Sequence, residues 1–183
     1  MTAERPEAPD ISPVPPETRD WTVVIDQGCA ECGFDPHLDV PATGERVRDT
    51  VDRWVAVLGR TRPAERPRPG TWSPLEYACH VRDLSRVFRE RVRLMLDEED
   101  PVLTDWDQDA VAVQERYNEQ DPYEVSGEIA QELRATADAF DAVSGEQWAR
   151  TGRRGDGAEF TVGSLAVYFR HDVEHHLRAD VRG

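Results

Sequence analysis

Residues 72–83 read WSPLEYACHVRD, and this stretch decides the fold. Ser73 is a typical N-cap residue, Pro74 suits the first helical position, and Glu76 can complete a capping box, so a helix begins here. Apolar residues then recur at helical spacing, and most of the arginines between them fall on the opposite side. The pattern predicts a long amphipathic helix over residues 75–96 whose apolar side faces a core.

Three further segments show the same helical spacing of apolar residues. They follow predicted N-caps at Thr43, Ser126 and Thr161. A long acidic connection over residues 97–109 separates the first two long helices from the last two, and no run of alternating strands occurs. The sequence therefore predicts an all-α fold, a four-helix bundle.

The chain before the bundle has a different composition. Residues 1–20 are rich in proline and poor in large apolar side chains, which predicts a disordered tail. Residues 21–42 form a predicted N-terminal extension, in which the run that begins at Trp21 is either a strand or a docked extended segment, and a CxxC motif follows. Residues 43–183 are the predicted bundle.

Composition excludes several classes of function. The chain has 183 residues, and its 22 basic residues are all arginine against 37 acidic ones, which gives a formal net charge of −15 at pH 7. Such a charge repels phosphate backbones, so we expect no nucleic-acid partner. No apolar run approaches the ~20 residues that a bilayer needs, and the N-terminus lacks the features of a signal peptide. We expect a cytoplasmic protein without a membrane partner.

Three of the five histidines lie in residues 170–176, RHDVEHH, on the last predicted helix. His171 and His175 are four residues apart, so their imidazoles leave one face about 6 Å apart, whereas His176 points about 100° away. His80 lies on the apolar side of its helix, where its nitrogens need a partner. If the two helices face each other, His80, His171 and His175 can hold one metal ion; otherwise the pair is solvated or hydrogen-bonded to carboxylates.

These motifs resemble the DinB/YfiT-like superfamily of four-helix metalloproteins. The WSPLE start followed by His80, and the HxxxH pair His171 and His175 some ninety residues later, match the family pattern, and the resemblance covers about residues 43–181. It implies a divalent metal ion, commonly zinc or nickel, held by these three histidines. For several members it also implies a transferase or isomerase that uses a low-molecular-weight thiol such as mycothiol or bacillithiol.

The predicted site suits thiol chemistry. A metal held by three neutral imidazoles keeps its charge and lowers the pKa of a bound thiol, whose thiolate is the reactive form. We therefore predict a metal-dependent S-transferase or isomerase, a monomer or homodimer, that acts on a small-molecule thiol and an electrophile. Tyr77 and Tyr168 are candidate hydrogen-bond donors to substrate, or core aromatics. Arg153 and Arg154, in the loop before the last helix, are candidates for binding the thiol cofactor, or solvated side chains.

Two other functions stay open. The first is a non-catalytic metal-binding, stress-associated protein, which a fourth protein ligand such as Asp172 or His176 would favour. The second is a metal-dependent hydrolase, although no HExxH arrangement supplies its usual glutamate base. Cys29 and Cys32 resemble half of a zinc knuckle, but no second CxxC supplies the other ligands, so a second zinc, a redox pair and a tight turn are all alternatives.

Overall fold

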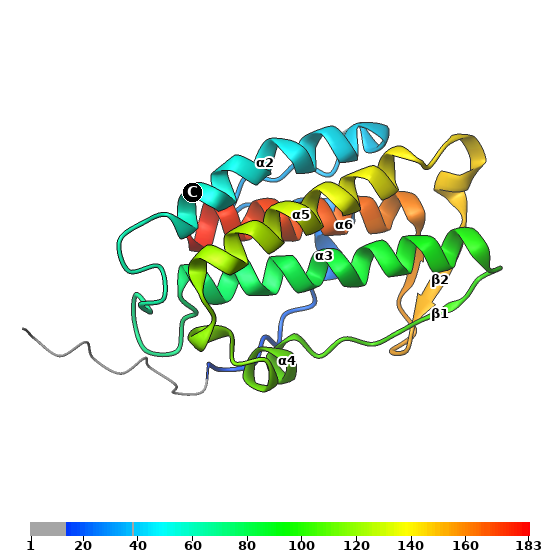
Figure 1. Cartoon of the computed structure of the whole chain (residues 1–183). Helices are drawn as coiled ribbons and strands as arrows, with labels where there is room; N and C mark the ends of the chain where they lie inside the picture. Colours follow the sequence, from blue (N-terminus) through cyan, green and yellow to red (C-terminus); the bar gives the residue numbers. More distant parts are fainter. Residues whose placement is uncertain (1–13, 38) are drawn as a thin grey trace, which may run out of the picture.

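The computed structural model describes residues 14–37 and 39–183, and most of these residues are helical (Figure 1). Four long helices form the body of the molecule: α2 (Thr43–Leu58), α3 (Pro74–Asp97), α5 (Pro122–Asp141) and α6 (Val162–His175). The shorter elements are η1 (Trp21–Val23), α1 (Val24–Gln27), η2 (Val40–Ala42), β1 (Val102–Leu103), α4 (Gln108–Gln114), η3 (Tyr117–Glu119), η4 (Gly145–Ala149), β2 (Thr151–Arg154), β3 (Glu159–Thr161) and the π-helical turn η5 (His176–Asp180). The predicted four-helix bundle is confirmed.

The four long helices enclose one apolar core. Helix α5 packs against α2 and α3, and α6 packs against the same two helices, so α5 and α6 close the bundle (Figure 1). Phe169 of α6 lies at the centre, with its ring centroid 5.3 Å from that of Phe88 and 5.7 Å from that of Phe140. Because α6 is packed on several sides, the directions of its side chains are fixed by the core.

Two of the predicted helix starts are confirmed. The Ser73 hydroxyl accepts a hydrogen bond from the Glu76 amide (3.2 Å), and the Glu76 carboxylate accepts one from the Ser73 amide (2.8 Å), which is the predicted capping box. Thr161 likewise caps α6 by accepting a hydrogen bond from the Ser164 amide at 3.0 Å. The two helices that carry the histidines therefore begin where the sequence places them.

The other two predicted caps are wrong. Helix α5 begins at Pro122 rather than after Ser126, because Asp121 accepts a hydrogen bond from the Tyr123 amide (2.7 Å) and acts as the cap. Thr43 is the first residue of α2 rather than its cap, and its hydroxyl donates to the Val40 carbonyl at 2.6 Å. The Asp-Pro pair at the start of α5 carries the same kind of signal as Ser73 with its proline, and it outweighs the later serine.

A small three-stranded sheet precedes α6, where the sequence predicts only a loop. Strand β2 pairs in parallel with β1 and antiparallel with β3, in the order β1, β2, β3. The hairpin of β2 and β3 ends at Thr161, the cap of α6. It therefore fixes the end of α6 opposite the histidines.

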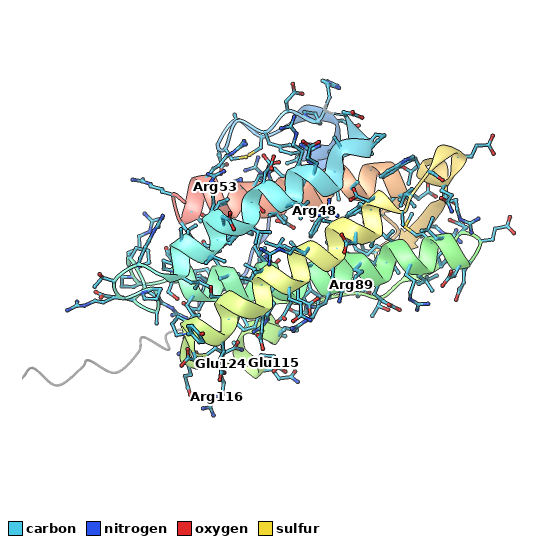
Figure 2. The ribbon with its side chains drawn as sticks, turned by 45° about the horizontal axis from the view of Figure 1, so that its top comes forward. Arg48, Arg53, Arg89, Glu115, Arg116 and Glu124 are labelled. Carbon is cyan, nitrogen blue, oxygen red and sulfur yellow. The ribbon has the colours of Figure 1, made fainter. Side chains whose placement is uncertain are left out.

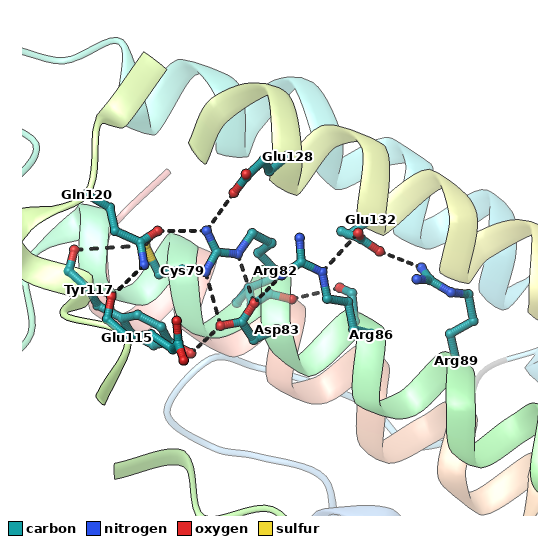
Figure 3. Close-up of polar contacts among 12 residues, drawn as sticks. Cys79, Arg82, Asp83, Arg86, Arg89, Glu115, Tyr117, Gln120, Glu128 and Glu132 are labelled. Carbon is teal, nitrogen blue, oxygen red and sulfur yellow. Dashed lines mark hydrogen bonds and ion pairs between the residues drawn. The ribbon is translucent and has the colours of Figure 1, made fainter. Parts of the chain in front are cut away.

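Charged side chains join α3 to α5 on the outside of the bundle (Figure 3). Arg82 pairs with Glu128 at 2.6 Å, and Glu132 accepts from both Arg86 (2.9 Å) and Arg89 (2.6 Å). The arginines of α3 thus take the polar side predicted for them. The Arg82 side chain is buried, whereas Arg86 and Arg89 are partly exposed, and exposed pairs are each worth roughly 1 kcal/mol or less.

A similar contact joins α2 to α5. Arg48 pairs with Asp138 at 2.5 Å and with Asp141 at 2.6 Å, and Figure 2 labels it where α2 lies beside α5. Gly44 stands nearby in α2, where an added Cβ would lie 2.7 Å from the Ala137 carbonyl oxygen. The two helices therefore approach closely at the start of α2 and are joined by charge further along it.

Residues 21–34, here called the N-terminal segment, pack against α6. Of the two alternatives predicted for the run at Trp21, the strand is absent and the docked segment is present but helical rather than extended, because the Asp20 carboxylate accepts a hydrogen bond from the Thr22 amide (2.9 Å) and caps the helical turns η1 and α1. Of the predicted disordered tail, residues 1–13 lie outside the described residues, and residues 14–20 contain no helix or strand. Within the described part of the chain, no helix combines the length and apolar character needed to cross a membrane.

Candidate metal centres

Helix α6 and the turn after it present four potential ligands on two adjacent faces. His171 and His175 are four residues apart, and so are Asp172 and His176. An α-helix turns by about 100° per residue, so each pair shares a face and the two faces are rotated by one residue step. The two pairs consequently meet different neighbours, and each forms a cluster of possible metal ligands.

The first cluster joins His171 and His175 to Cys29 and Cys32. One ligand atom from each of the four side chains lies within 4.8 Å of the others, and all of them are buried or half-buried. Cys29 Sγ is 3.5 Å from His175 Nδ1, and both cysteines are free thiols. We call this the Cys/His cluster.

The CxxC turn owes its shape to backbone contacts. The amide of Cys29 donates to the Phe34 carbonyl at 3.0 Å, and the Gly33 amide donates to the Cys29 carbonyl at 2.8 Å. Gly28 has a φ of +69°, and an added Cβ would lie 2.5 Å from the Phe34 carbonyl oxygen, so only glycine fits there. This closed turn brings Cys32 back beside Cys29.

Aromatic rings cover the Cys/His cluster. The Trp21 ring lies 5.3 Å from that of His171 and 5.0 Å from that of His175, and the Phe34 ring lies 5.4 Å from His171. Burial, followed by the neighbouring histidines, lowers the pKa of His171 to about 3, and burial raises the pKa of Cys32 to about 11. The imidazoles are therefore neutral near pH 7, which is the form that binds a metal.

The second cluster joins His80 of α3 to Asp172 and His176. One ligand atom from each lies within 4.8 Å of the others, and the ring centroids of His80 and His176 are 4.9 Å apart. His176 Nε2 is 3.6 Å from the Asp172 carboxylate, and its Nδ1 is 2.7 Å from the Asp180 carboxylate. We call this the His/Asp cluster.

His80 is buried among aromatic rings. Its ring stacks on Trp106 at 5.3 Å and lies 5.5 Å from Trp72, and its Nδ1 is buried without a hydrogen-bond partner. Burial lowers the pKa of His80 well below its usual value, and burial raises the pKa of Asp172 to about 6. An unpartnered imidazole nitrogen in an apolar site is costly, so this nitrogen is suited to a ligand.

Two cavities open beside the clusters. The smaller, of about 310 Å³, is lined by residues of both clusters together with Trp21 and Tyr77. The larger, of about 830 Å³, is lined by Arg91 and Arg154 among others. Asp172 lines both cavities. Of the His/Asp cluster, Asp172 therefore stands at the wall that the two cavities share, His176 lines the smaller cavity, and the buried His80 lines neither.

The structure divides the predicted histidine trio between the two clusters. His171 and His175 share a face as expected, with ring centroids 5.0 Å apart, but their partners are the two cysteines. His80 meets His176, because the side chain that points about 100° away from the pair points toward α3. Asp172, considered as a fourth ligand, joins this second group.

The other predicted site residues take different positions. Tyr168 lines both cavities, and burial raises its pKa to about 12. Tyr77 lines the smaller cavity and lies 5.0 Å from the His176 ring. Arg154 lines the larger cavity and pairs with Asp156, whereas Arg153 pairs with Asp100 at 2.9 Å and lines neither cavity. Arg153 is thus set apart from the other candidates.

The union of CxxC with HxxxH was not predicted from the sequence. Each motif offers two possible ligands, and CxxC alone left a second zinc, a redox pair and a tight turn as alternatives. The HxxxH pair was available, but the prediction assigned it to His80. The doubled histidine at His175 and His176 was the signal that two faces of the helix, and not one, carry ligands.

The fold and the site define a class of protein, a four-helix bundle with a candidate metal centre. In this centre a histidine of α3 lies beside a histidine and a carboxylate at the end of α6. The chain belongs to the DinB superfamily, whose family model matches residues 3–179. This match includes the N-terminal segment, which the motif resemblance over residues 43–181 did not.

One solved structure shares the fold. It is YfiT from Bacillus subtilis, which is described as "a probable metal-dependent hydrolase with an unusual four-helix bundle topology". The TM-score is 0.65 at 20% sequence identity, over 76% of this chain and 81% of the other. Among curated proteins, none matches this chain significantly. The likeness to YfiT establishes the bundle and leaves the reaction to be argued from the site.

Proposed function

We propose that the protein is a metal-dependent enzyme for small polar molecules, in which His80, Asp172 and His176 hold a divalent cation such as zinc or nickel. The observation that carries the proposal is the meeting of these three groups, whose ligand atoms lie within 4.8 Å of one another, beside two cavities, where Asp172 lines both and His176 lines the smaller. Three protein ligands leave room for a substrate, which is the pattern of catalytic rather than structural sites. A bound ion would supply Lewis-acid chemistry and lower the pKa of a coordinated thiol or water.

The donor set fits such an ion. His80 Nδ1 is buried and unpartnered, and Asp172 and His176 bring an oxygen and a nitrogen to within 4.8 Å of a ligand atom of His80. Two imidazoles and a carboxylate are a known ligand combination for catalytic zinc. The carboxylate lowers the net charge of the site by one compared with three histidines. A metal ion in this site is therefore a weaker Lewis acid than one held by the trio predicted from sequence.

The chain's own residues would bind and orient the substrate. Arg91 and Arg154 offer donors on the larger cavity, and carboxylates such as Asp105 offer acceptors on the same wall. Mixed donors and acceptors suit a hydroxyl-rich molecule, and Tyr168 stands between the two cavities, where its protonated hydroxyl can donate to a substrate. A mycothiol-type or bacillithiol-type thiol cosubstrate joined to a small electrophile fits this lining, with S-transfer or isomerisation as the reaction.

The test is a conjugation assay with a generic electrophile and, in turn, mycothiol, bacillithiol, glutathione and cysteine. Metal-loaded protein is expected to turn over with one of these thiols, and His80→Ala should reduce the rate by ~100-fold or more. His37→Ala, at a histidine outside both clusters, is the matched control. Full rate and full metal content in His80→Ala would contradict the assignment.

The same assay separates the alternatives. Bound metal without turnover of any thiol would favour a non-catalytic metal-binding protein. Hydrolysis of esters or amides without added thiol would favour a metal-dependent hydrolase, and YfiT is described as a "probable metal-dependent hydrolase".

A further inference from the structure

We propose that Cys29, Cys32, His171 and His175 form a second, structural zinc site, which fastens the N-terminal segment to α6. This inference is independent of the proposed function, because its ligands are distinct from His80, Asp172 and His176. It joins two motifs that lie about 140 residues apart in the chain. The ion is identified by the chemistry of the four ligands, their spacing and their burial.

The spacing fits a tetrahedral ion. Bonds of roughly 2.0–2.3 Å place the ligand atoms of a tetrahedral zinc site about 3.3–3.8 Å apart. Cys29 Sγ and His175 Nδ1 are already 3.5 Å apart, and all four ligand atoms lie within 4.8 Å of one another. Side-chain movements of about 1 Å or less therefore complete the geometry.

A second observation also points to a ligand at this place. Both ring nitrogens of His171 are buried and have no hydrogen-bond partner. A neutral imidazole carries one donor and one acceptor, and burying either without a partner costs free energy. A metal bond satisfies one nitrogen directly, so the orphaned imidazole is explained by an ion between it and the cysteines.

The chemistry of the ligands selects zinc among common divalent cations. Thiolate and imidazole are typical zinc ligands, whereas magnesium and calcium prefer oxygen. Two thiolates and two neutral imidazoles bring the net charge of a Zn²⁺ site to zero. A neutral complex can be buried under Trp21 and Phe34 without the cost of an unpaired charge.

The site is closed, which marks it as structural rather than catalytic. Four protein ligands fill a tetrahedral shell, and no position remains for a substrate. The segment that it fastens places Trp21 in the wall of both cavities and Glu31 in the wall of the smaller one. Zinc at the Cys/His cluster would therefore hold the cavity wall beside the His/Asp cluster in place.

Cobalt substitution tests this site through a spectroscopic signal that the His/Asp cluster cannot produce. Cobalt-loaded wild-type protein is expected to show a thiolate-to-cobalt charge-transfer band in the near ultraviolet and strong visible bands of tetrahedral geometry. The double variant Cys29→Ser, Cys32→Ser should lose the charge-transfer band and one equivalent of zinc. Cys79→Ser is the matched control, because Cys79 lies in neither cluster, and it should keep both.

The outcomes decide between the two sites. His80→Ala should lose the equivalent of zinc bound at the His/Asp cluster and keep the charge-transfer band. The band therefore reports on the Cys/His cluster even if the proposed function fails. The proposal would be overturned if reduced, cobalt-loaded wild-type protein lacks the charge-transfer band. This test does not require the cysteine variants to fold. An unchanged band and an unchanged zinc content in the double cysteine variant would overturn it as well.

Discussion

The bundle and the N-terminal segment are held in place by different means. In the bundle, four long helices share a continuous apolar core in which residues such as Trp54 and Phe169 are fully buried. In the segment, a small cluster of Val24, Cys29 and Phe34 rests on Val167 of α6. A large core can offset the entropy of ordering a chain, whereas a cluster of this size needs a further fastening. If the Cys/His cluster binds zinc as proposed, metal removal should loosen the segment and leave the bundle unchanged.

The largest expected effect tests the bundle. Phe169→Ala removes the ring between Phe88 and Phe140 and leaves a cavity, so the free energy of unfolding should fall by about 3–5 kcal/mol. Urea unfolding followed by circular dichroism measures this loss. Val113→Ala, at an exposed position, should change little. A loss that disappears when zinc is removed would mean that the bundle also depends on metal.

Zinc removal tests the segment. At a free zinc concentration about one hundred times the dissociation constant, binding stabilises the docked state by about 2.7 kcal/mol, and a chelator removes this contribution. Chymotrypsin should then cut after Trp21 and Phe34, which are packed against the Cys/His cluster, while the buried Phe169 stays uncut. Mass spectrometry of the fragments identifies the sites. Equal cleavage with and without zinc would remove the contrast between the two regions.

A smaller effect is expected from Val24→Ala. The side chain is fully buried in the segment's cluster, and the loss of two carbons should weaken docking by about 1.5 kcal/mol. Amide hydrogen exchange should report faster exchange in the segment and unchanged exchange in the core of α5. The exposed neighbour Val23 supplies the control variant Val23→Ala. Faster exchange throughout the bundle would show that the two regions unfold together.

The smallest effect concerns charge on the bundle surface. Burial raises the pKa of Glu132, but the hydrogen bonds from Arg86 and Arg89 outweigh it and hold the pKa below its ordinary value. A lowered pKa adds stability above the ordinary pKa, and this stability is lost as the pH falls through the lowered pKa.

Glu132→Gln should therefore cost roughly 0.5–1 kcal/mol at pH 7. The difference from wild type should shrink at acidic pH in a series of urea unfolding curves. Glu146→Gln, at an exposed position, is the control. A difference that stays constant down to low pH would show that the charge of Glu132 is not the cause.

The fold was largely predictable from local signals. The Ser73 cap and the apolar spacing after it indicated α3, and Thr161 with the residues that follow indicated α6, because these signals lie within a few residues of each other. The turn at Trp21 and the start of α5 were predicted wrongly because short polar caps, at Asp20 and Asp121, outweighed apolar pattern and the later Ser126. The small sheet joins segments about 50 residues apart, which periodicity does not report.

The candidate site was only half predictable for a related reason. Spacing on one helix shows which side chains share a face, and the pair His171 and His175 was found in this way. Which neighbour each face meets depends on how the helices and the N-terminal segment pack, and that is a property of the whole fold. Spacing therefore grouped His80 with this pair, whereas the structure brings His80 beside Asp172 and His176 and brings the two cysteines beside the pair.

The ring contacts give each of the two clusters its own tryptophan neighbours, one at the Cys/His cluster and two at His80. Trp21 contacts the histidines of the Cys/His cluster, while Trp72 and Trp106 contact His80. A cobalt ion quenches the fluorescence of nearby tryptophans. Cobalt in the Cys/His cluster should therefore quench Trp21 most, and cobalt in the His/Asp cluster should quench Trp72 and Trp106 most. Trp21→Phe would silence one reporter and leave the other, and the order in which the two positions fill could be followed by titration without any added dye.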